Sequence, residues 1–391
     1  MQVRREICKN VRKRKMIRCL TEYHRPCAHC FFSKMKRISL LSLLFFSILN
    51  IGHAQTNELA FQPLDQVLAD TNFRFVSSDH TVDLPYCVSH KIRSKFVLGY
   101  SACRLAVEAY YFPGTSNEKA LVIAGMHGSE LSALDVAQII IAQLESGTTP
   151  YYDVVVIPVL FPDNAQKAVK AHSKTNTGRY TSSQHADPNR QFPMPGLSFN
   201  EAFPFDIHGR KVEIENTYLL QLIQSYQPSR IINLHAIKDV SKAGVYADPR
   251  TDCQGIALGF KSDEALALEM AGFIRDHGGK VPGNALEEKP TGLYYKDPLP
   301  VPEGFYQPRN LNGSQLPGKR GCGASIGGWA TTAVCDDIAP RNAIRLLTME
   351  FPGYSSYQQY SGIQKESCFF QTYLYASSVT RIFLNRIEED L

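Results

Sequence analysis

The sequence predicts an α/β fold in which helices cover both faces of a mixed, mostly parallel twisted sheet. Short apolar runs alternate along the chain with segments whose apolar residues recur every three to four positions. Strands that alternate with helices are joined by right-handed crossovers, which build a mainly parallel sheet between two helical layers. With 391 residues, 44% of them apolar and 20% charged, the chain is long enough for such a core and ordinary for a globular enzyme.

The expected elements follow one another in a regular order. Four apolar runs are expected to be strands: 120–124, 154–160, 230–235 and 345–350. Four segments with helical spacing are expected to be helices: 131–144, 213–226, 263–276 and 370–387. Two stretches rich in Pro, Gly and polar residues are expected to be loops: 163–212 and 280–330. Loops of that length inside a domain tend to be functional.

The N-terminal region contains a secretory signal pattern at residues 35–54. Residues 35–37 are a basic start, 38–51 are almost entirely apolar, and Gly52 and Ala54 supply small residues at a cleavage site. The apolar run of ~14 residues is shorter than the ~20 that a transmembrane helix needs, and an uncleaved anchor is the alternative. We expect cleavage after Ala54, a periplasmic or secreted product, and no stable membrane span in it.

Residues 1–34 form a basic leader ahead of this signal. They hold four of the ten cysteines, and Cys27 and Cys30 have the spacing of a small zinc knuckle. We favour the alternative that Met35 is the true start, because a basic leader would hinder ordinary export. The catalytic domain is then expected to be 55–391.

The charge of the chain changes when residues 1–54 are left out. The remainder has 30 Lys and Arg against 35 Asp and Glu, so its net charge is −5 rather than +5. The basic balance of the whole sequence is therefore no sign of a nucleic-acid partner, and none is expected.

Six cysteines remain in 55–391, and an even number in an exported protein suggests disulfides. Two of the possible disulfides join cysteines that are near each other in the sequence, and the two remaining cysteines would form the third. The predicted pairs are Cys87–Cys103, Cys322–Cys335 and Cys253–Cys368. Six free thiols or a cysteine metal site are the alternatives, and no C-x-x-C pair in 55–391 favours the metal site.

Three side chains suited to zinc follow predicted strands. His127 and Glu130 are three residues apart after the first strand, and His235 ends the third. Two imidazoles and one carboxylate, with one position open for water, are an established catalytic zinc set. Ligands bind beyond the carboxyl ends of parallel strands, where Glu350 also lies. We predict one zinc ion held by His127, Glu130 and His235, beside Glu350.

The flanks of these residues resemble the metallocarboxypeptidase family related to pancreatic carboxypeptidase A. The resemblance covers about 230 residues, 120–353, and implies a carboxypeptidase-like architecture. The segments that carry it, in chain order, are Val122–Glu130, Ile157–Asp163, Asp187–Pro193, Asn233–His235 and Leu347–Pro352. The wider superfamily includes deacylases of the aspartoacylase and succinylglutamate desuccinylase kind.

The resemblance implies roles for several side chains. Zinc would polarise the scissile carbonyl and acidify a water, and Glu350 would be the general base that carries the proton to the leaving amine. Asn189 and Arg190 would bind the substrate's terminal carboxylate, since the planar fork of Arg matches a carboxylate. Arg179 is the best candidate for the arginine that stabilises the oxyanion. Each arginine could instead form a structural or surface contact.

The segment Ala324–Trp329 resembles the part of the family that lines the specificity pocket, so Ser325 and Trp329 are expected to bind substrate. Trp329 could equally be a core residue. Many members of the family have a Tyr shortly before this segment. The present sequence has none in 316–322, and Tyr306 is a distant substitute.

Exported bacterial members include murein peptide amidases and D,L-carboxypeptidases, which cut between D-glutamate and diaminopimelate. We therefore expect a peptide substrate from the cell wall, with Asp336 and Asp337 as candidate partners for the second ammonium of diaminopimelate. A general peptide carboxypeptidase or a deacylase of small acylamino acids is the alternative. A non-catalytic binding protein would lack Glu350 or a metal ligand, and all four residues are present.

Overall fold

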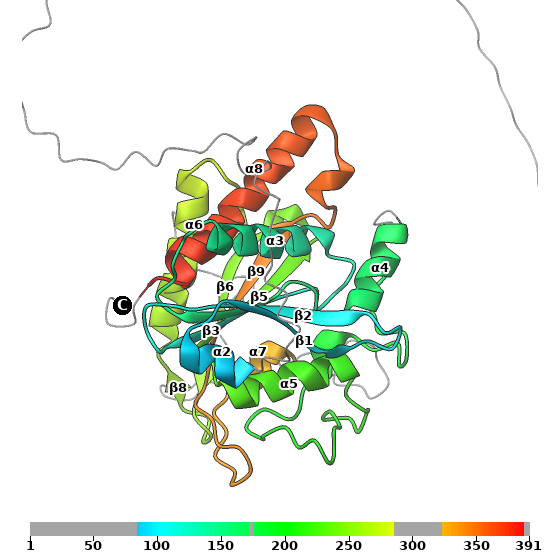
Figure 1. The fold of residues 1–391 in the computed structure, drawn as a ribbon, viewed down its shortest axis with the longest axis vertical. Helices are drawn as coiled ribbons and strands as arrows, with labels where there is room; N and C mark the ends of the chain where they lie inside the picture. The colour runs from blue at the N-terminus through cyan, green and yellow to red at the C-terminus, as the bar shows by residue number, and fades with distance from the viewer. Residues whose placement is uncertain (1–83, 172–175, 285–322, 387–391) are drawn as a thin grey trace, which may run out of the picture. The chain divides into compact units, whose positions relative to one another are not determined.

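A seven-stranded mixed sheet runs through the part of the chain that the computed structural model describes, residues 84–171, 176–284 and 323–386 (Figure 1). These residues all belong to the unit Val76–Leu391. Across the sheet the strand order is β1-β2-β4-β3-β5-β9-β6. In that order the strands span Ser94–Tyr100, Ala106–Phe112, Asp153–Ile157, Lys119–Ala124, Arg230–Ile237, Arg345–Pro352 and Gly244–Asp248.

Parallel pairing forms the centre of this sheet. β4, β3, β5 and β9 are parallel neighbours, while β1 and β2 at one edge and β6 at the other pair antiparallel. The central strands are buried on both faces, which is typical of parallel sheets covered by helices. The predicted α/β class is confirmed. A separate antiparallel pair is formed by β7 (Arg250–Thr251) and β8 (Ala257–Leu258).

Helices cover both faces of the sheet (Figure 1). One face carries α3 (Leu131–Glu145), α6 (Phe260–Asp276) and α8 (Gly362–Ser378), which continues into a π-helix at Val379–Phe383. The other face carries α2 (Leu84–His90), α5 (Ile214–Tyr226) and α7 (Ile326–Ala330). The remaining described helix is α4, Pro162–Lys170, and short 3-10 turns span Pro188–Arg190, Val240–Lys242 and Tyr357–Gln359.

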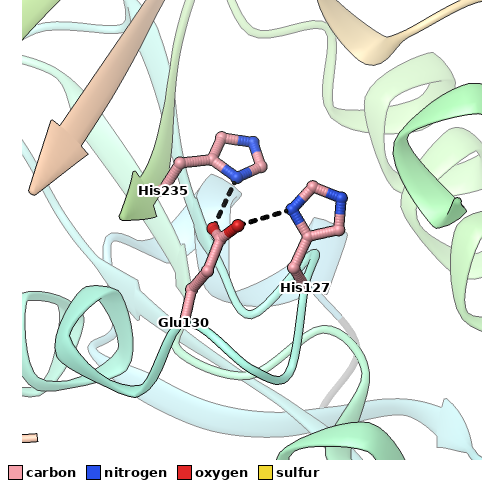
Figure 2. A group of neighbouring side chains, drawn as sticks. All are labelled: His127, Glu130 and His235. Carbon is pink, nitrogen blue, oxygen red and sulfur yellow. Dashed lines mark hydrogen bonds and ion pairs between the residues drawn. The ribbon is translucent and has the colours of Figure 1, made fainter. Parts of the chain in front are cut away.

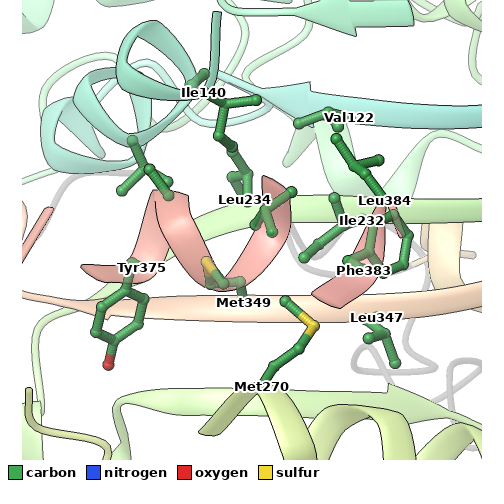
Figure 3. Close-up of a cluster of buried hydrophobic side chains, with 14 of the residues drawn as sticks. Val122, Ile140, Ile232, Leu234, Met270, Leu347, Met349, Tyr375, Phe383 and Leu384 are labelled. Carbon is green, nitrogen blue, oxygen red and sulfur yellow. The ribbon is translucent and has the colours of Figure 1, made fainter. Parts of the chain in front are cut away.

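The larger apolar cluster lies between the sheet and α3, α6 and α8 (Figure 3). Each side chain fully buried there contributes roughly 1.5–3 kcal/mol of transfer free energy. Members from the strands are Val122, Ile232, Leu234, Leu347 and Met349, and members from the helices are Ile140, Met270 and Tyr375. Because side chains alternate along a strand, the residues between these face the α5 and α7 side. His235 and Glu350 therefore share that second face.

The predicted strands and helices are present, with shifted ends, and several elements were not predicted. Residues 163–212 were expected to be a loop, yet α4 begins at Pro162 and extends into them. Pro at the helix start, Asp163 in the first turn and Lys167 in the last are helix signals that could have revealed it. The antiparallel edge strands β1, β2 and β6 were also missed. β1 is partly exposed along its length, so its apolar pattern is weak.

The disulfide prediction was wrong. Cys253 pairs with Cys335, across 82 residues of sequence. Thr251 N donates to Thr331 O and Ala333 N donates to Thr251 O, and these bonds bring the two segments together. Cys87 is a buried free thiol and Cys103 an exposed one, while Cys368 is also free. Cys322 lies outside the described residues.

Other predictions also fall outside the described residues. They concern the leader 1–34, the signal segment 35–54 and Tyr306. Within 84–171, 176–284 and 323–386, no helix has both the length and the apolar character needed to cross a bilayer.

We predict that the double variant Cys253→Ser, Cys335→Ser loses about 2–4 kcal/mol of unfolding free energy, because the crosslink closes a long loop in the unfolded chain. Chemical denaturation under non-reducing conditions measures the change. Cys103→Ser, at an exposed free thiol, is the control and should leave the midpoint unchanged. Equal midpoints for all three proteins would contradict the prediction.

Candidate metal centre and active site

The turn between β3 and α3 carries the first two predicted ligands, His127 and Glu130. Gly125 follows β3 with a φ of +71°, and a Cβ there would lie 2.9 Å from Val159 Cα. A Cβ on Gly128 would lie 2.2 Å from Asn164 C at the start of α4. Only glycine fits at these two points, because any other residue would clash with the neighbouring backbone. The tight turn places both ligands at the carboxyl end of the sheet.

Glu130 joins the three predicted ligands into one buried group (Figure 2). Glu130 Oε1 lies 2.9 Å from His127 Nδ1, and Glu130 Oε2 lies 2.8 Å from His235 Nδ1. Potential ligand atoms from the three residues lie within 4.8 Å of one another. Two imidazoles and one carboxylate at this spacing fit a zinc ion with a fourth position open. The structure thus brings together the ligand set that the sequence predicted.

Asp187 orients the first imidazole. Its Oδ1 lies 2.9 Å from His127 Nε2, the ring nitrogen that faces away from Glu130. Burial alone would lower the pKa of His127, but the charges of Glu130 and Asp187 outweigh burial and raise the pKa to about 9. His127 is therefore protonated at neutral pH when no metal is bound. A carboxylate behind a histidine ligand sets the ring's orientation and increases its basicity.

His235 has amide neighbours instead of a second carboxylate. Its Nε2 lies 2.8 Å from Asn233 Nδ2 and 3.5 Å from Asn189 Nδ2. Burial lowers the pKa of His235 by more than the charge of Glu130 raises it. The ring is therefore neutral and ready to act as a ligand. A metal on Nδ1 would leave the hydrogen on Nε2, and the Asn233 amide can turn its oxygen to accept it.

Glu350 lies beside His235 because β5 and β9 are parallel neighbours with these two residues in register. Its side chain lines the same cavity as the three ligands. Burial, together with the charge of Glu130, raises the pKa of Glu350 to about 8. A bound cation would lower that pKa, because it favours the ionised carboxylate. A carboxylate with a raised pKa is suited to taking up and releasing a proton near neutral pH.

Arg179 contacts the ligand group directly. Its Nη1 donates to Glu130 Oε1 at 2.9 Å, and its Nη2 donates to Asp187 Oδ2 at 3.4 Å. Burial lowers the pKa of Arg179, but the two carboxylates more than compensate, so the pKa is raised and the guanidinium stays charged. The side chain also lines the cavity. The predicted oxyanion-stabilising arginine is therefore within the site.

The 3-10 turn Pro188–Arg190 presents the two predicted carboxylate-binding residues to the same cavity. Asp187 Oδ1 accepts from Asn189 N at 2.9 Å, which caps the turn. Asn189 Oδ1 accepts from Ile326 N at 3.0 Å and ties the turn to α7. Arg190 Nη1 donates to Asn189 O, and its Nε has no partner among the described residues. Arg190 can therefore offer donors to an incoming carboxylate.

The structure separates the other two predicted substrate-binding residues. Ser325 lines the cavity, although its Oγ caps α7 by accepting from Gly328 N. Trp329 is fully buried in the apolar cluster under α5 and does not line the cavity. Its Nε1 donates to Leu197 O, and Arg341 stacks 4.4 Å from the ring centre. Trp329 is therefore placed as a core residue, the alternative that the sequence had left open.

Several residues of the site were not assigned a role from the sequence. Asp187, whose carboxylate orients His127, belongs to the segment Asp187–Pro193, which also contains Asn189. Its place in that segment was the signal that could have identified it. Asp248, Thr348 and Tyr354 also line the cavity. They come from β6, β9 and the segment after β9. β6 is an antiparallel edge strand, so no regular spacing in the sequence relates Asp248 to the ligands on the parallel strands.

We predict that zinc binding by the metal-free protein releases a proton below pH ~9, because His127 must lose its proton to coordinate. The apparent affinity should rise by about tenfold per pH unit below that value and level off above it. Titration calorimetry in buffers of different ionisation enthalpy counts the protons released. An affinity that does not change between pH 6 and 8 would contradict the prediction.

Removing the carboxylate behind His127 should weaken zinc binding. Asp187→Asn is expected to lower zinc affinity by about 10-fold to 100-fold. Competition with a chromogenic chelator measures the loss. Asp276→Asn, at an exposed residue of α6, is the matched control and should bind zinc as the unchanged protein does.

Part of the chain matches a known protein family. Residues 112–251 match the family model described as zinc carboxypeptidase. No curated protein matches the chain. Among solved structures, carboxypeptidase A from Helicoverpa armigera is 16% identical with a TM-score of 0.46, and the match covers 81% of this chain and 78% of that one. Murein-tripeptide amidase from Escherichia coli O157 is 17% identical with a TM-score of 0.37, over 73% and 92% of the two chains.

The family match includes His127, Glu130 and His235 together with Arg179, Asn189 and Arg190. The buried His-Glu-His group can hold the metal that the family's description names. On these grounds residues 112–251 are similar to the zinc carboxypeptidase family, and the site of the chain is that of a metallocarboxypeptidase.

Proposed function

We propose that this metallocarboxypeptidase is exported and hydrolyses a C-terminal peptide or amide bond in murein peptides. The observation that carries the proposal is one cavity lined by the metal ligands, by Glu350 and by Arg190. A cavity with these groups can bind a terminal carboxylate next to the place where a bond is broken. Export is supported by the signal pattern of residues 35–54.

Each side chain of the cavity has a separate role in the proposed hydrolysis. Arg190, with Asn189 beside it, binds the terminal carboxylate of the substrate by charge-assisted hydrogen bonds. When bound to His127, Glu130 and His235, zinc would supply Lewis-acid polarisation of the scissile carbonyl. Glu350 takes the proton of the attacking water and passes it to the leaving amine. Arg179 stabilises the negative charge that develops on the carbonyl oxygen.

The murein substrate draws support from the expected compartment, because an enzyme exported by a signal of the bacterial kind would meet peptidoglycan. The murein-tripeptide amidase among the compared structures is, by its name, an enzyme of such a peptide. A general peptide carboxypeptidase and a deacylase of small acylamino acids differ from this proposal only in the substrate. They are the other outcomes of the test.

The test incubates the purified zinc-loaded protein with muropeptides, with ordinary peptides and with acylated amino acids, each with and without a chelator. Chelator-sensitive release of diaminopimelate from the muropeptide would support the proposal. Cleavage of ordinary peptides alone would reassign the enzyme to general peptide turnover. Cleavage of acylated amino acids alone would make it a deacylase.

We predict that Glu350→Gln lowers kcat by about 10²-fold to 10⁴-fold, because general acid–base catalysis typically contributes that much. The variant keeps the shape of the side chain, and Glu350 is not a predicted ligand, so zinc content should stay at one ion per chain. Stopped assays and metal analysis measure both quantities. Glu366→Gln, at an exposed residue of α8, is the control and should keep full activity.

We further predict that Arg190→Lys lowers kcat/KM for substrates with a free C-terminal carboxylate by about 10-fold to 100-fold, since lysine cannot form the planar two-pronged contact. Substrates whose terminus is amidated should change little. A comparison of the two substrate series measures the difference. An equal loss on both would show that Arg190 does not read the carboxylate.

A further inference from the structure

We propose that Arg210, held by Asp206, is a positioning residue that fixes the turn carrying Arg190 and thereby sets how well the enzyme binds a terminal carboxylate. The inference rests on the proposed function, because it concerns the side chain that receives the carboxylate of the substrate. Arg210 does not itself line the cavity, so it acts on the substrate only through Arg190.

The turn Pro188–Arg190 depends on side chains for the donors to its carbonyl groups. It is a 3-10 helix of three residues, which has few backbone bonds to fix its direction. The first carbonyl accepts from Asn216 Nδ2 at 2.8 Å, and the second accepts from Arg190 Nη1 at 2.6 Å. The third, Arg190 O, accepts from Arg210 Nη2 at 2.7 Å. The first and third bonds attach the turn to α5 and to the loop before it.

Asp206 holds the guanidinium of Arg210 in the direction that this contact needs. Its Oδ2 accepts from Arg210 Nε at 2.6 Å, and the side chain of Asp206 is fully buried. Its Oδ1 accepts from the backbone amides of His208 and Arg210 at 2.8 Å and 2.9 Å. The loop 206–210 is therefore closed on itself. Because the guanidinium is planar, the bond at Nε also fixes where Nη2 points.

The contact between Arg210 and Arg190 O is closely enclosed. A Cβ on Gly323 would lie 2.0 Å from Arg190 O and 2.8 Å from Arg210 Nη2. The residue after Gly323 is joined to the same segment, since Phe192 N donates to Ala324 O at 3.2 Å. The carbonyl oxygen thus has backbone close on one side and the guanidinium on the other. Without the guanidinium it would lack its donor, and the turn would shift to find another.

A shift of the turn would move the side chain that meets the substrate. Arg190 Nη1 is bonded to the carbonyl of Asn189, so the guanidinium of Arg190 follows its own backbone. Charge-assisted hydrogen bonds to a carboxylate depend on distance and angle, and a small displacement weakens them. The predicted metal ligands belong to other elements, namely β5 and the turn after β3. The loss should therefore appear in carboxylate binding, with the zinc content unchanged.

The first experiment measures kcat and KM of the zinc-loaded full chain on two matched substrates, one with a free C-terminal carboxylate and one amidated. We expect Arg210→Gln to raise KM for the free carboxylate by about 10-fold, with little change in kcat or on the amidated substrate. Arg93→Gln is the matched control, because Arg93 also donates to backbone carbonyls, those of Leu144 and Glu145, away from the cavity. It should keep both values.

A double-mutant cycle decides whether Arg210 acts through Arg190. In the Arg190→Lys background, Arg210→Gln should cost less than about 2-fold, because the group that Arg210 positions is already altered. Losses that simply multiply would overturn the proposal, and so would equal losses on the free and the amidated substrate. Arg210→Lys keeps the charge that faces Asp206 and should give an intermediate KM. It replaces Arg210→Gln under the same criteria if that variant does not fold.

A second measurement needs no turnover. Calorimetry compares an N-acetylated dipeptide with its C-terminal amide as ligands of the zinc-loaded Glu350→Gln protein, with and without Arg210→Gln. A preference for the carboxylate that falls by about 10-fold on Arg210→Gln supports the proposal, and an unchanged preference overturns it. If the zinc-loaded enzyme cleaves no substrate with a free C-terminus, the proposed function fails, while this comparison still decides the role of Arg210.

Discussion

The register between the parallel strands β5 and β9 is the constraint on which the site depends. It sets His235 opposite Glu350, so that the proposed metal ligand and the proposed general base lie side by side at the same end of the sheet. The alternate residues of both strands are apolar and buried against α3, α6 and α8. A slip of one residue in the register of β5 and β9 would turn those apolar side chains toward the cavity. It would also turn His235 or Glu350 into the core. Packing of the core therefore holds His235 and Glu350 in their relative positions.

Buried charge explains how the site is organised. The carboxylate of Glu130 faces both imidazoles, Arg179 and the backbone NH of Ala236. Burial would raise the pKa of Glu130, but the two imidazoles dominate and lower it well below its usual value. The pKa of Glu350 moves in the opposite direction, since it is buried near this negative charge. One carboxylate is thus kept ionised for a metal and another is prepared to carry a proton.

The residues that line the cavity come from elements that are distant in sequence. Arg190 is held by a 3-10 turn that is tied to α7 through Asn189, and Asp248 belongs to the edge strand β6. These elements meet around one cavity that is lined by acidic side chains and by Arg179 and Arg190. Contacts from several elements to one substrate would orient the bond to be cut, because holding the reactants in place lowers the entropic part of the barrier.

The sequence by itself determined the central strands, the helices that cover them and the ligand group His127, Glu130 and His235. These follow from local patterns: apolar runs, helical spacing and polar residues at strand ends. The tertiary structure alone decided the Cys253–Cys335 disulfide, the burial of Trp329 and the place of Asp248 in the cavity. Each depends on which distant segments become neighbours, and an antiparallel edge strand or a long loop has no local pattern that names its partner. Nearness in sequence governs how easily a loop closes, whereas packing governs which contacts remain in the folded chain.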